Sequence, residues 1–280
     1  MDKNDLLKLL DNIQPGTEPG KATFNKHDRV LIIDGLNLFL RNFAVINYVN
    51  QDGVHIGGLG GFLRSLGFLI NQNTPTSVYI IFDGVGSTIN RKNLLPEYKS
   101  GRNLTRVNRS STFEDMDEEN ESKINQISRL IHYLKCLPVK LISLDKVEAD
   151  DIIAHLSRYL ATKHNSKCTI VSADKDFLQL VDKNITVYSP IAKEYYTPEL
   201  VKEKFGLPAK NFILYKTLMG DNSDKVPGLK GLGPKKLFKF FPELQEEEMS
   251  LDDLHNICEG KYKEHVIYSR VIYDYETLQK

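Results

Sequence analysis

The sequence predicts an α/β fold, in which a mostly parallel central sheet is flanked by helices. Three apolar runs carry this prediction: RVLIID (29–34), SVYIIFD (77–83) and KCTIVSAD (167–174). Continuous apolar runs rich in β-branched residues are typical of strands that are buried on both faces, as they are in parallel sheets. Helical patterns separate the runs, and this alternation of strand and helix indicates right-handed crossover connections.

Weaker patterns complete the predicted core. Two further strands are expected at 138–142 and 185–189. Between the strands, the spacing of apolar residues predicts helices at about 57–72, 118–135 and 148–163.

The chain is predicted to have three parts. Residues 1–25 form an N-terminal appendage that ends in a linker rich in proline and glycine. Residues 26–190 form the core, which contains a long basic insertion at about 86–120. Residues 191–280 form a helical C-terminal region that shows no convincing strand.

Helix signals in the C-terminal part are local and clear. The segment TPELVKEKFG (197–206) has a threonine cap, a proline at the first helical position and a glycine at its end. Further helices are expected at 208–219, 234–241 and 262–277.

The charge of the chain is balanced overall but unevenly distributed. The 280 residues include 37 basic and 37 acidic side chains, so the basic surplus expected of a nucleic-acid-binding protein is absent. However, residues 91–109 carry six basic side chains against one acid, and residues 225–239 carry five lysines and no acid. Two basic islands in a neutral chain can bind phosphate locally.

Composition also excludes several classes of protein. No apolar run approaches the roughly 18 residues that a membrane span needs, and the charged N-terminus does not resemble a signal peptide. The three cysteines form neither a disulfide framework nor a zinc pattern. We therefore expect a reducing, cytoplasmic location.

Carboxylates gather at one edge of the predicted sheet. Asp34, Asp83 and Asp174 each lie at the carboxyl end of a predicted strand, and these ends form the binding edge of open α/β sheets. A helix opens with Glu148 and Asp151 on one face. The complete set of acids that we expect to contribute is Asp34, Asp83, Glu148, Asp150, Asp151, Asp174, Asp176, Asp221 and Asp224.

So many carboxylates repel one another unless protons or cations neutralise them. Oxygen ligands favour Mg²⁺ or Mn²⁺. Two such ions about 4 Å apart could activate a water molecule and stabilise both the attacking and the leaving oxygen of a phosphodiester. A single aspartate at a strand end is more often a turn or cap residue, but that interpretation becomes weak when it must explain all of these acids together.

Two segments are candidates for phosphate binding. Gly231 and Gly233 precede a helix that carries Lys235 and Lys236, a pattern that resembles a helix–hairpin–helix and suits the duplex backbone. The alternative is an ordinary helical corner with solvated lysines. The basic stretch around Tyr98 suits a single strand, with phosphates neutralised and a base stacked, although a flexible surface loop is the alternative.

Five segments in order resemble the 5′-nuclease or flap-endonuclease superfamily, in particular its single-domain bacteriophage and bacterial members. The segments are IIDGLN (32–37), LPEYKSGR (95–102), VEADDIIA (147–154), SADKDF (172–177) and MGDNSDKVPGLKGLGPKK (219–236). The resemblance extends from about residue 29 to 241, and it depends on the combined order and spacing of the motifs.

The resemblance implies a PIN-like nuclease core with a helical arch over the insertion at 86–120 and a C-terminal helix–hairpin–helix. It implies two Mg²⁺ ions, which Mn²⁺ can replace, and a K⁺ ion at the helix–hairpin–helix. One metal would be held by Asp34, Asp83, Glu148, Asp150 and Asp151. The other would be held by Asp174, Asp176, Asp221 and Asp224.

The resemblance also assigns roles to basic residues. Tyr98, Lys99 and Arg102 match the base of the arch, through or under which the 5′ strand passes, and Lys99 would stabilise the phosphate in the transition state. Arg41 matches a position that contacts phosphate. The expected catalytic set is therefore Lys99, Arg102, Asp34, Asp83 and Asp174.

The predicted function is that of a 5′→3′ exonuclease and flap endonuclease that acts on DNA with a 5′ flap or 5′ end in replication or repair. Activity on the RNA of RNA–DNA hybrids is also expected, as are a monomeric state, no membrane association and a location in the cytoplasm of a bacterium or a phage-infected host. A PIN-type ribonuclease would lack the arch and the helix–hairpin–helix. A non-enzymatic junction-binding protein would lack some of the acids, and here none is missing.

Overall fold

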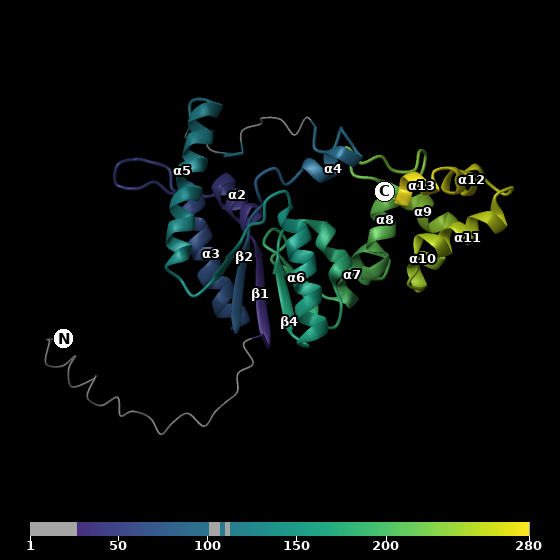
Figure 1. The fold of residues 1–280 in the computed structure, drawn as a ribbon, viewed down its shortest axis with the longest axis horizontal. Helices are drawn as coiled ribbons and strands as arrows, with labels where there is room; N and C mark the ends of the chain where they lie inside the picture. Colours follow the sequence, from purple (N-terminus) through teal and green to yellow (C-terminus); the bar gives the residue numbers. More distant parts are fainter. Residues whose placement is uncertain (1–26, 101–106, 110–112, 280) are drawn as a thin grey trace, which may run out of the picture.

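A six-stranded sheet forms the centre of the molecule (Figure 1). The structure is a computed structural model that describes residues 27–100, 107–109 and 113–279. The strand order is β3-β2-β1-β4-β5-β6, in which β6 is antiparallel to β5 and all other neighbours are parallel. The strands are β1 (Arg29–Asp34), β2 (Ser77–Ile81), β3 (Lys140–Ile142), β4 (Lys167–Val171), β5 (Ile185–Ser189) and β6 (Glu194–Tyr196). The predicted fold class is confirmed.

Helices cover both faces of the sheet. The first face is packed by α2 (Gly35–Val45), α3 (Gly57–Asn73) and α5 (Met116–Lys135). The opposite face is packed by α6 (Ala149–Lys163), the 3-10 helix η1 (Lys175–Leu180) and α7 (Pro198–Phe205).

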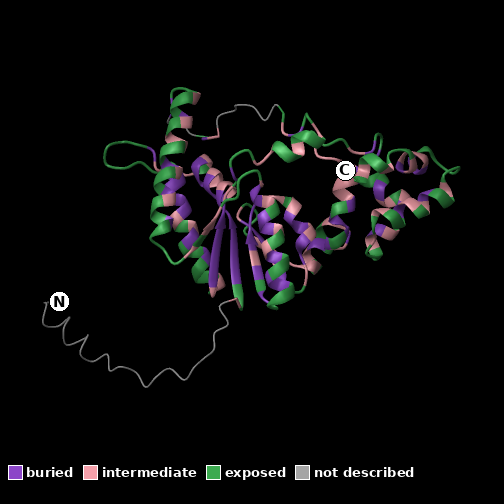
Figure 2. Cartoon of the chain, viewed as in Figure 1, coloured by how far each residue is buried: buried purple, intermediate pink, exposed green. Residues whose placement is uncertain are grey.

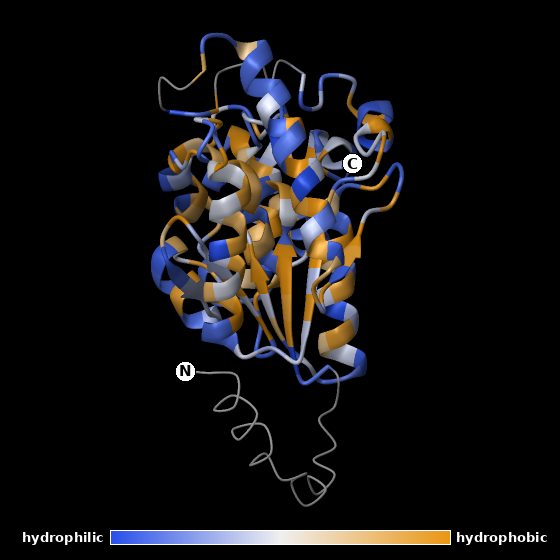
Figure 3. Ribbon diagram, turned by 90° about the vertical axis from the view of Figure 1, so that its left-hand side faces the viewer, coloured by the Kyte–Doolittle hydropathy of each residue, from blue (hydrophilic) through white to orange (hydrophobic). Residues whose placement is uncertain are grey.

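Alternate side chains of β1 pack into the two hydrophobic clusters, one on each face of the sheet. Leu31 and Ile33 belong to the cluster under the first face, whereas Val30 and Ile32 belong to the cluster under the second. Successive side chains of a strand point to opposite faces, so a strand buried on both sides must be apolar throughout. Figure 3 shows the hydrophobic strands enclosed between the helices.

The strand and helix predictions failed at two places in this core. Helix α2 was not predicted, although Asp34 caps it by accepting a hydrogen bond from the backbone N–H of Asn37 at 3.1 Å. The expectation of no strand beyond residue 190 was wrong because β6 pairs with β5, with Tyr195 opposite Tyr188. Three residues are too few to show a period, and the two tyrosines, whose ring centroids lie 4.7 Å apart in a tilted arrangement, belong to different strands.

The C-terminal residues form a helical region with its own core, as Figure 2 shows by the buried positions. Fully buried Leu218, Leu237 and Phe241 meet Leu254 and Val271 there. Its elements are η2 (Ala209–Asn211), α8 (Phe212–Met219), α9 (Pro234–Phe240), α10 (Glu243–Glu246), α11 (Leu251–Lys261), α12 (Val266–Tyr273) and α13 (Tyr275–Gln279). The unpredicted α11 begins with a capping box formed by Ser250 and Asp253.

The structure describes the two ends of the expected arch. Helix α4 (Ile89–Leu94) begins the insertion, and Asp115 caps α5 at its end. On the returning side, the buried Glu119 carboxylate accepts hydrogen bonds from the backbone N–H groups of Val107 and Asn108 at 3.0 and 3.3 Å. The Asn108 amide in turn donates to the carbonyl oxygen of Phe43 at 2.6 Å. These bonds fasten the returning segment to α2 and α5.

No described helix is both long and apolar enough to cross a membrane. The predicted appendage, residues 1–25, lies outside the described residues, and the proposed domain limits remain a prediction.

Candidate active site

Asp34 lies at the centre of the carboxyl edge of the sheet. It ends β1, which lies between β2 and β4, where the strand order reverses and where open α/β sheets bind their ligands. Besides capping α2, its carboxylate accepts a hydrogen bond from the Ser172 hydroxyl at 3.1 Å. The Ser172 oxygen accepts the backbone N–H of Asp174 at 3.1 Å, so one serine links the two acids.

The neighbouring strands deliver two more acids to this edge. Asp83 follows β2 and accepts the backbone N–H of Ala149, at the start of α6, at 2.7 Å. Asp174 follows β4 and caps η1 by accepting the backbone N–H of Asp176 at 2.9 Å. Each carboxylate is therefore held in place by a backbone hydrogen bond, which for Asp174 comes from its own turn and for Asp83 from the start of α6.

The electrostatics show that these acids lie close together. The pKa of Asp34 is raised to about 6, chiefly by burial, with a contribution from the charges of Asp83 and Asp174 and with hydrogen bonds to Asn37 and Ser172 opposing the rise. Burial also raises the pKa of Asp150 to about 7, with added repulsion from Asp34 and Asp174. A cation at this edge would relieve both effects.

Glu148 is the most deeply buried member of the acidic set. It precedes α6 and has an exposed fraction of 2%. One oxygen, Oε2, contacts Arg91 at 2.9 Å, the Lys99 ammonium at 3.0 Å and the Tyr98 hydroxyl at 3.2 Å. The other oxygen, Oε1, is buried without a hydrogen-bond partner. Because a buried unpaired carboxylate oxygen is costly, this atom fits a site that receives a cation.

Tyr98 and Lys99 bring the base of the arch against the acids. Burial raises the pKa of the Tyr98 hydroxyl to about 12, so that it remains a donor to Glu148. Burial alone would lower the pKa of Lys99, but its hydrogen bonds to Glu148 and Tyr98 and the charge of Glu148 together outweigh burial and raise it. Lys99 adopts a positive φ of 52°, and its backbone N–H donates to the carbonyl oxygen of Asp224 at 3.1 Å. Arg102, the third residue predicted here, lies outside the described residues.

Arg91 is a site residue that the sequence reasoning missed. Its guanidinium forms two hydrogen bonds with Asp151, at 3.0 and 2.8 Å, in addition to its contact with Glu148. The sequence singled out Arg91 only as one of the six basic residues of the stretch 91–109. Its place on the first helix after a strand-end acid, Asp83, is the signal that could have singled it out.

Lys216 joins two acids of the second predicted set. Asp176 and Asp221 both contact the ammonium of Lys216, with Nζ to oxygen distances of 3.0 and 2.6 Å. Asp221 also accepts the backbone N–H groups of Ser223 and Asp224 at 2.7 and 3.2 Å. Lys216 was not predicted, because nothing in its helix distinguishes it from a solvated lysine.

Charge pairing sets the ionisation of this second set. Burial alone would raise the pKa of Asp221, but hydrogen bonds from Lys216 and Ser223 outweigh it and hold the pKa well below its ordinary value. Burial alone would lower the pKa of Lys216, but Asp221 and Asp176 raise it to about 12. The pair is therefore ionised at neutral pH.

Among residues 27–100, 107–109 and 113–279, no three His, Cys, Asp or Glu side chains are grouped so that they could hold a metal ion directly. A Mg²⁺ ion does not require such a close group, because it keeps several of its waters and binds one or two carboxylates directly. The remaining acids would then act through those waters.

The predicted helix–hairpin–helix lies between α8 and α9. Gly231 has a φ of +83°, in the left-handed region that favours glycine, and Gly233 directly precedes α9. The exposed Lys236 ammonium reaches the carbonyl oxygen of Gly231 at 3.3 Å, and Lys235 is also exposed. The glycine backbone and the lysine charges therefore lie together at the start of α9.

Arg41 stands on α2, half-buried on the same side as the returning arch segment. Burial lowers its pKa, Tyr188 opposes this, and the nearby positive charge of Arg109 lowers it further. Two arginines approach each other here, an arrangement that favours an anion.

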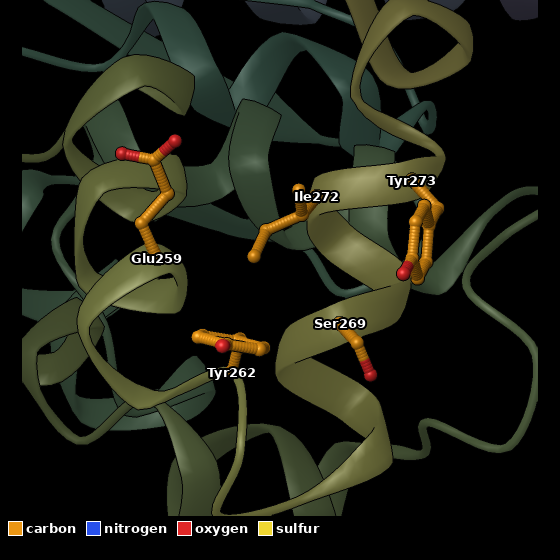
Figure 4. Close-up of a pocket in the computed structure, with 5 residues that line it drawn as sticks. All are labelled: Glu259, Tyr262, Ser269, Ile272 and Tyr273. Atoms are coloured by element: carbon orange, nitrogen blue, oxygen red, sulfur yellow. The ribbon is translucent and has the colours of Figure 1, made fainter.

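A separate cleft lies between α11 and α12, lined by Glu259, Tyr262, Ser269, Ile272 and Tyr273 (Figure 4). It shares no residue with the acidic sets, and only one of its five side chains is a carboxylate. The cleft is not part of the candidate active site.

The parallel sheet with acids at its carboxyl edge fits the predicted class of 5′-nucleases. The family model described as "5′-3′ exonuclease, N-terminal resolvase-like domain" matches residues 29–206, and the chain belongs to this family. The predicted superfamily is confirmed.

Relatives support the same family. A 5′-3′ exonuclease of Buchnera aphidicola subsp. Acyrthosiphon pisum is 34% identical over 212 residues, which cover 75% of this chain and 68% of that protein. DNA polymerase I of Bacillus subtilis is 32% identical over 243 residues, covering 84% of this chain. The chain spans about a quarter of the length of the DNA polymerase I relatives that it matches, 26% in this case.

Solved structures share the fold. The bacteriophage T5 5′-exonuclease with bound zinc superposes with a TM-score of 0.69 at 19% identity, covering 89% of this chain and 86% of that chain. A complex of the T5 flap endonuclease with DNA and metal ions gives a TM-score of 0.66 at 19% identity, covering 88% of each chain.

Proposed function

We propose that this protein is a metal-dependent, structure-specific 5′-nuclease that hydrolyses phosphodiester bonds in DNA at 5′ ends and flaps. The observation that carries the proposal is the buried Glu148, whose Oε1 lacks a hydrogen-bond partner, together with Asp150, whose carboxylate is repelled by Asp34, Asp174 and Glu148. A cation bound here would relieve both the unpaired oxygen and the repulsion. The family membership and the DNA- and metal-bound T5 structure of the same fold support this reading.

Two acidic sets would hold two Mg²⁺ ions, which Mn²⁺ can replace. Asp34, Asp83, Glu148, Asp150 and Asp151 form one set. Asp174, Asp176, Asp221 and Asp224 form the other. When bound, the ions would lower the pKa of a water molecule and stabilise the developing charge on the phosphate.

The residues of the chain would orient the scissile phosphate. Lys99 lies 3.0 Å from Glu148, so its ammonium can donate to a phosphate oxygen that enters the same place. Arg102 would act beside it on the 5′ strand, and Tyr98 would support both by packing under Lys99, whose Nζ lies 5.0 Å from the ring centroid. Arg41 would bind another phosphate of the substrate DNA.

The helical C-terminal region would hold the duplex. Gly231 and Gly233 allow close approach of a phosphate, and Lys235 and Lys236 supply charge. A K⁺ ion bound at this corner, activity on RNA–DNA hybrids, a monomeric state and a cytoplasmic role in replication or repair complete the proposal.

The test is cleavage of a 5′-labelled flap duplex in Mg²⁺ by the wild type, by Asp174→Asn and by the control Glu203→Gln. Asn can still accept the backbone N–H of Asp176, so the cap survives while the charge is lost. Glu203 is an exposed acid on α7. Wild type and control should cut near the junction, EDTA should abolish cutting, and Asp174→Asn should be slower by orders of magnitude at unchanged duplex binding.

Binding without cutting in Mg²⁺ and Mn²⁺ would refute the nuclease proposal and favour a junction-binding protein. Parallel reactions with single-stranded RNA and with an RNA–DNA hybrid separate the substrate classes. Preferred cutting of single-stranded RNA would favour the PIN-type ribonuclease instead.

A further inference from the structure

Lys216 occupies a position between two acids of the second set. It lies on α8, which packs against η1, and Figure 1 shows α8 where the core meets the C-terminal helices. Its Nζ lies 3.0 Å from Asp176 Oδ1 and 2.6 Å from Asp221 Oδ2. The two acids come from segments 45 residues apart, and the lysine holds them together.

The oxygens around Lys216 are arranged as they would be around a cation. Asp176 Oδ1 is buried and, despite its 3.0 Å contact with the ammonium, has no partner with hydrogen-bond geometry. The second oxygen of Asp221, Oδ1, accepts the N–H and the hydroxyl of Ser223, which fixes the direction of the carboxylate. Both acids therefore present an oxygen to one point, where the ammonium lies.

Asp34 and Asp174, the two acids that Ser172 links, differ in this respect. In the described part of the chain, neither forms an ion pair, and both are held only by hydrogen bonds to serine or backbone groups. An ion can therefore reach these carboxylates without displacing a charged side chain. An ion that binds Asp176 and Asp221 must first replace an ammonium.

We propose that Lys216 is a built-in counter-ion of the second acidic set, which competes with a divalent ion for Asp176 and Asp221. This inference rests on the proposed function, because it concerns the metal site of the same nuclease. It gives the acids different affinities: an ion binds readily at Asp34 and Asp174, and the site at Asp176 and Asp221 is filled only at higher concentration. Before it is filled, Lys216 keeps the Asp221 loop in place.

The test is a calorimetric titration of Mn²⁺ into the DNA-free protein, with free Mn²⁺ counted in parallel by electron paramagnetic resonance. Lys216→Met removes the charge while nearly preserving side-chain length. Lys216→Arg keeps the charge. Lys175→Met is the matched control, because it removes the same charge from η1, where Lys175 lies over the Phe205 ring instead of between acids.

Removal of the ammonium should tighten the weaker class of Mn²⁺ sites at least about tenfold in Lys216→Met, because two nearby acids lose their competing charge. In Lys216→Arg the affinity of the weaker class of Mn²⁺ sites should stay low. In Lys175→Met this affinity should change by less than about threefold, since the Lys175 ammonium lies over the Phe205 ring and not between the acids. Lys216→Gln serves as a second neutral variant if Lys216→Met lowers the melting temperature.

Unchanged or weaker Mn²⁺ binding in both neutral variants would overturn the inference, because a lysine that only braces the loop would loosen the site on removal. If the wild type binds Mn²⁺ and cuts the flap but the neutral variants bind no tighter, only this inference fails. If the wild type binds no Mn²⁺ at all, the proposed function fails with it.

Discussion

Asp34→Asn should make the metal-free protein more stable while removing its activity. The pKa of Asp34 rises from its ordinary value of 3.8 to about 6 on folding, which corresponds to about 3 kcal/mol at about 1.4 kcal/mol per unit. Its exposed fraction of 7% leaves little solvent to screen this cost. The asparagine weakens one or both of the bonds to Asn37 and Ser172, at about 1 kcal/mol in total, so a net gain of about 2 kcal/mol remains.

The gain should depend on pH in a defined direction. Because the folded-state pKa is raised, the folded protein binds the extra proton between about pH 4 and 6, and wild-type stability falls as the pH rises through this window. The advantage of Asp34→Asn should therefore be absent below about pH 4 and complete above about pH 6.

Thermal unfolding in EDTA at pH 4 and pH 8 measures this effect. About 2 kcal/mol should raise the melting temperature at pH 8 by about 4 °C or more in a chain of this size. The control is Asp28→Asn, an exposed acid just before the opposite end of the same strand. Equal melting temperatures of Asp34→Asn and wild type at pH 8, or a gain equally large at pH 4, would refute the reasoning.

Three further outcomes are expected. Arg91→Ala should lower flap cleavage more than tenfold, because Arg91 contacts both Glu148 and Asp151. The control Lys92→Ala, on the same helix, should leave cleavage nearly unchanged, and equal rates of the two variants would contradict the role of Arg91. The double variant Lys235→Ala and Lys236→Ala should weaken duplex binding uniformly and reduce the slope of log affinity against log salt by about 2, as fluorescence anisotropy would show. Leu237→Ala should destabilise the C-terminal helical core by about 2–5 kcal/mol in denaturant unfolding, since the side chain is fully buried; a smaller loss would mean that the core can close around the gap.

The sheet was predictable because its strands are buried on both faces. A run such as RVLIID has no polar side to confuse with a helix stripe, so its bounds were predicted as observed, at Arg29–Asp34. β6 and α2 escaped prediction for the converse reason. β6 has only three residues, and α2 continues directly from β1 through Asp34, which ends one element and caps the next.

The acids were predictable from topology, whereas their partners were not. Any aspartate at the carboxyl end of a central parallel strand must reach the same edge, so sequence position alone brings Asp34 and Asp174 together. No such rule connects Arg91 to Asp151, 60 residues away, or Lys216 to Asp176, 40 residues away. Those contacts depend on how whole helices pack, which local patterns do not encode.

The same contacts explain why net charge was a poor guide. A chain with equal numbers of acids and bases shows no basic surplus, yet three of its cations, Arg91, Lys99 and Lys216, contact acids of the candidate site in the DNA-free protein. Their positive charge is needed there because the acids would otherwise repel one another. Some of the acids are therefore neutralised internally at one edge of the sheet, and a phosphate-binding surface elsewhere can coexist with a neutral sum.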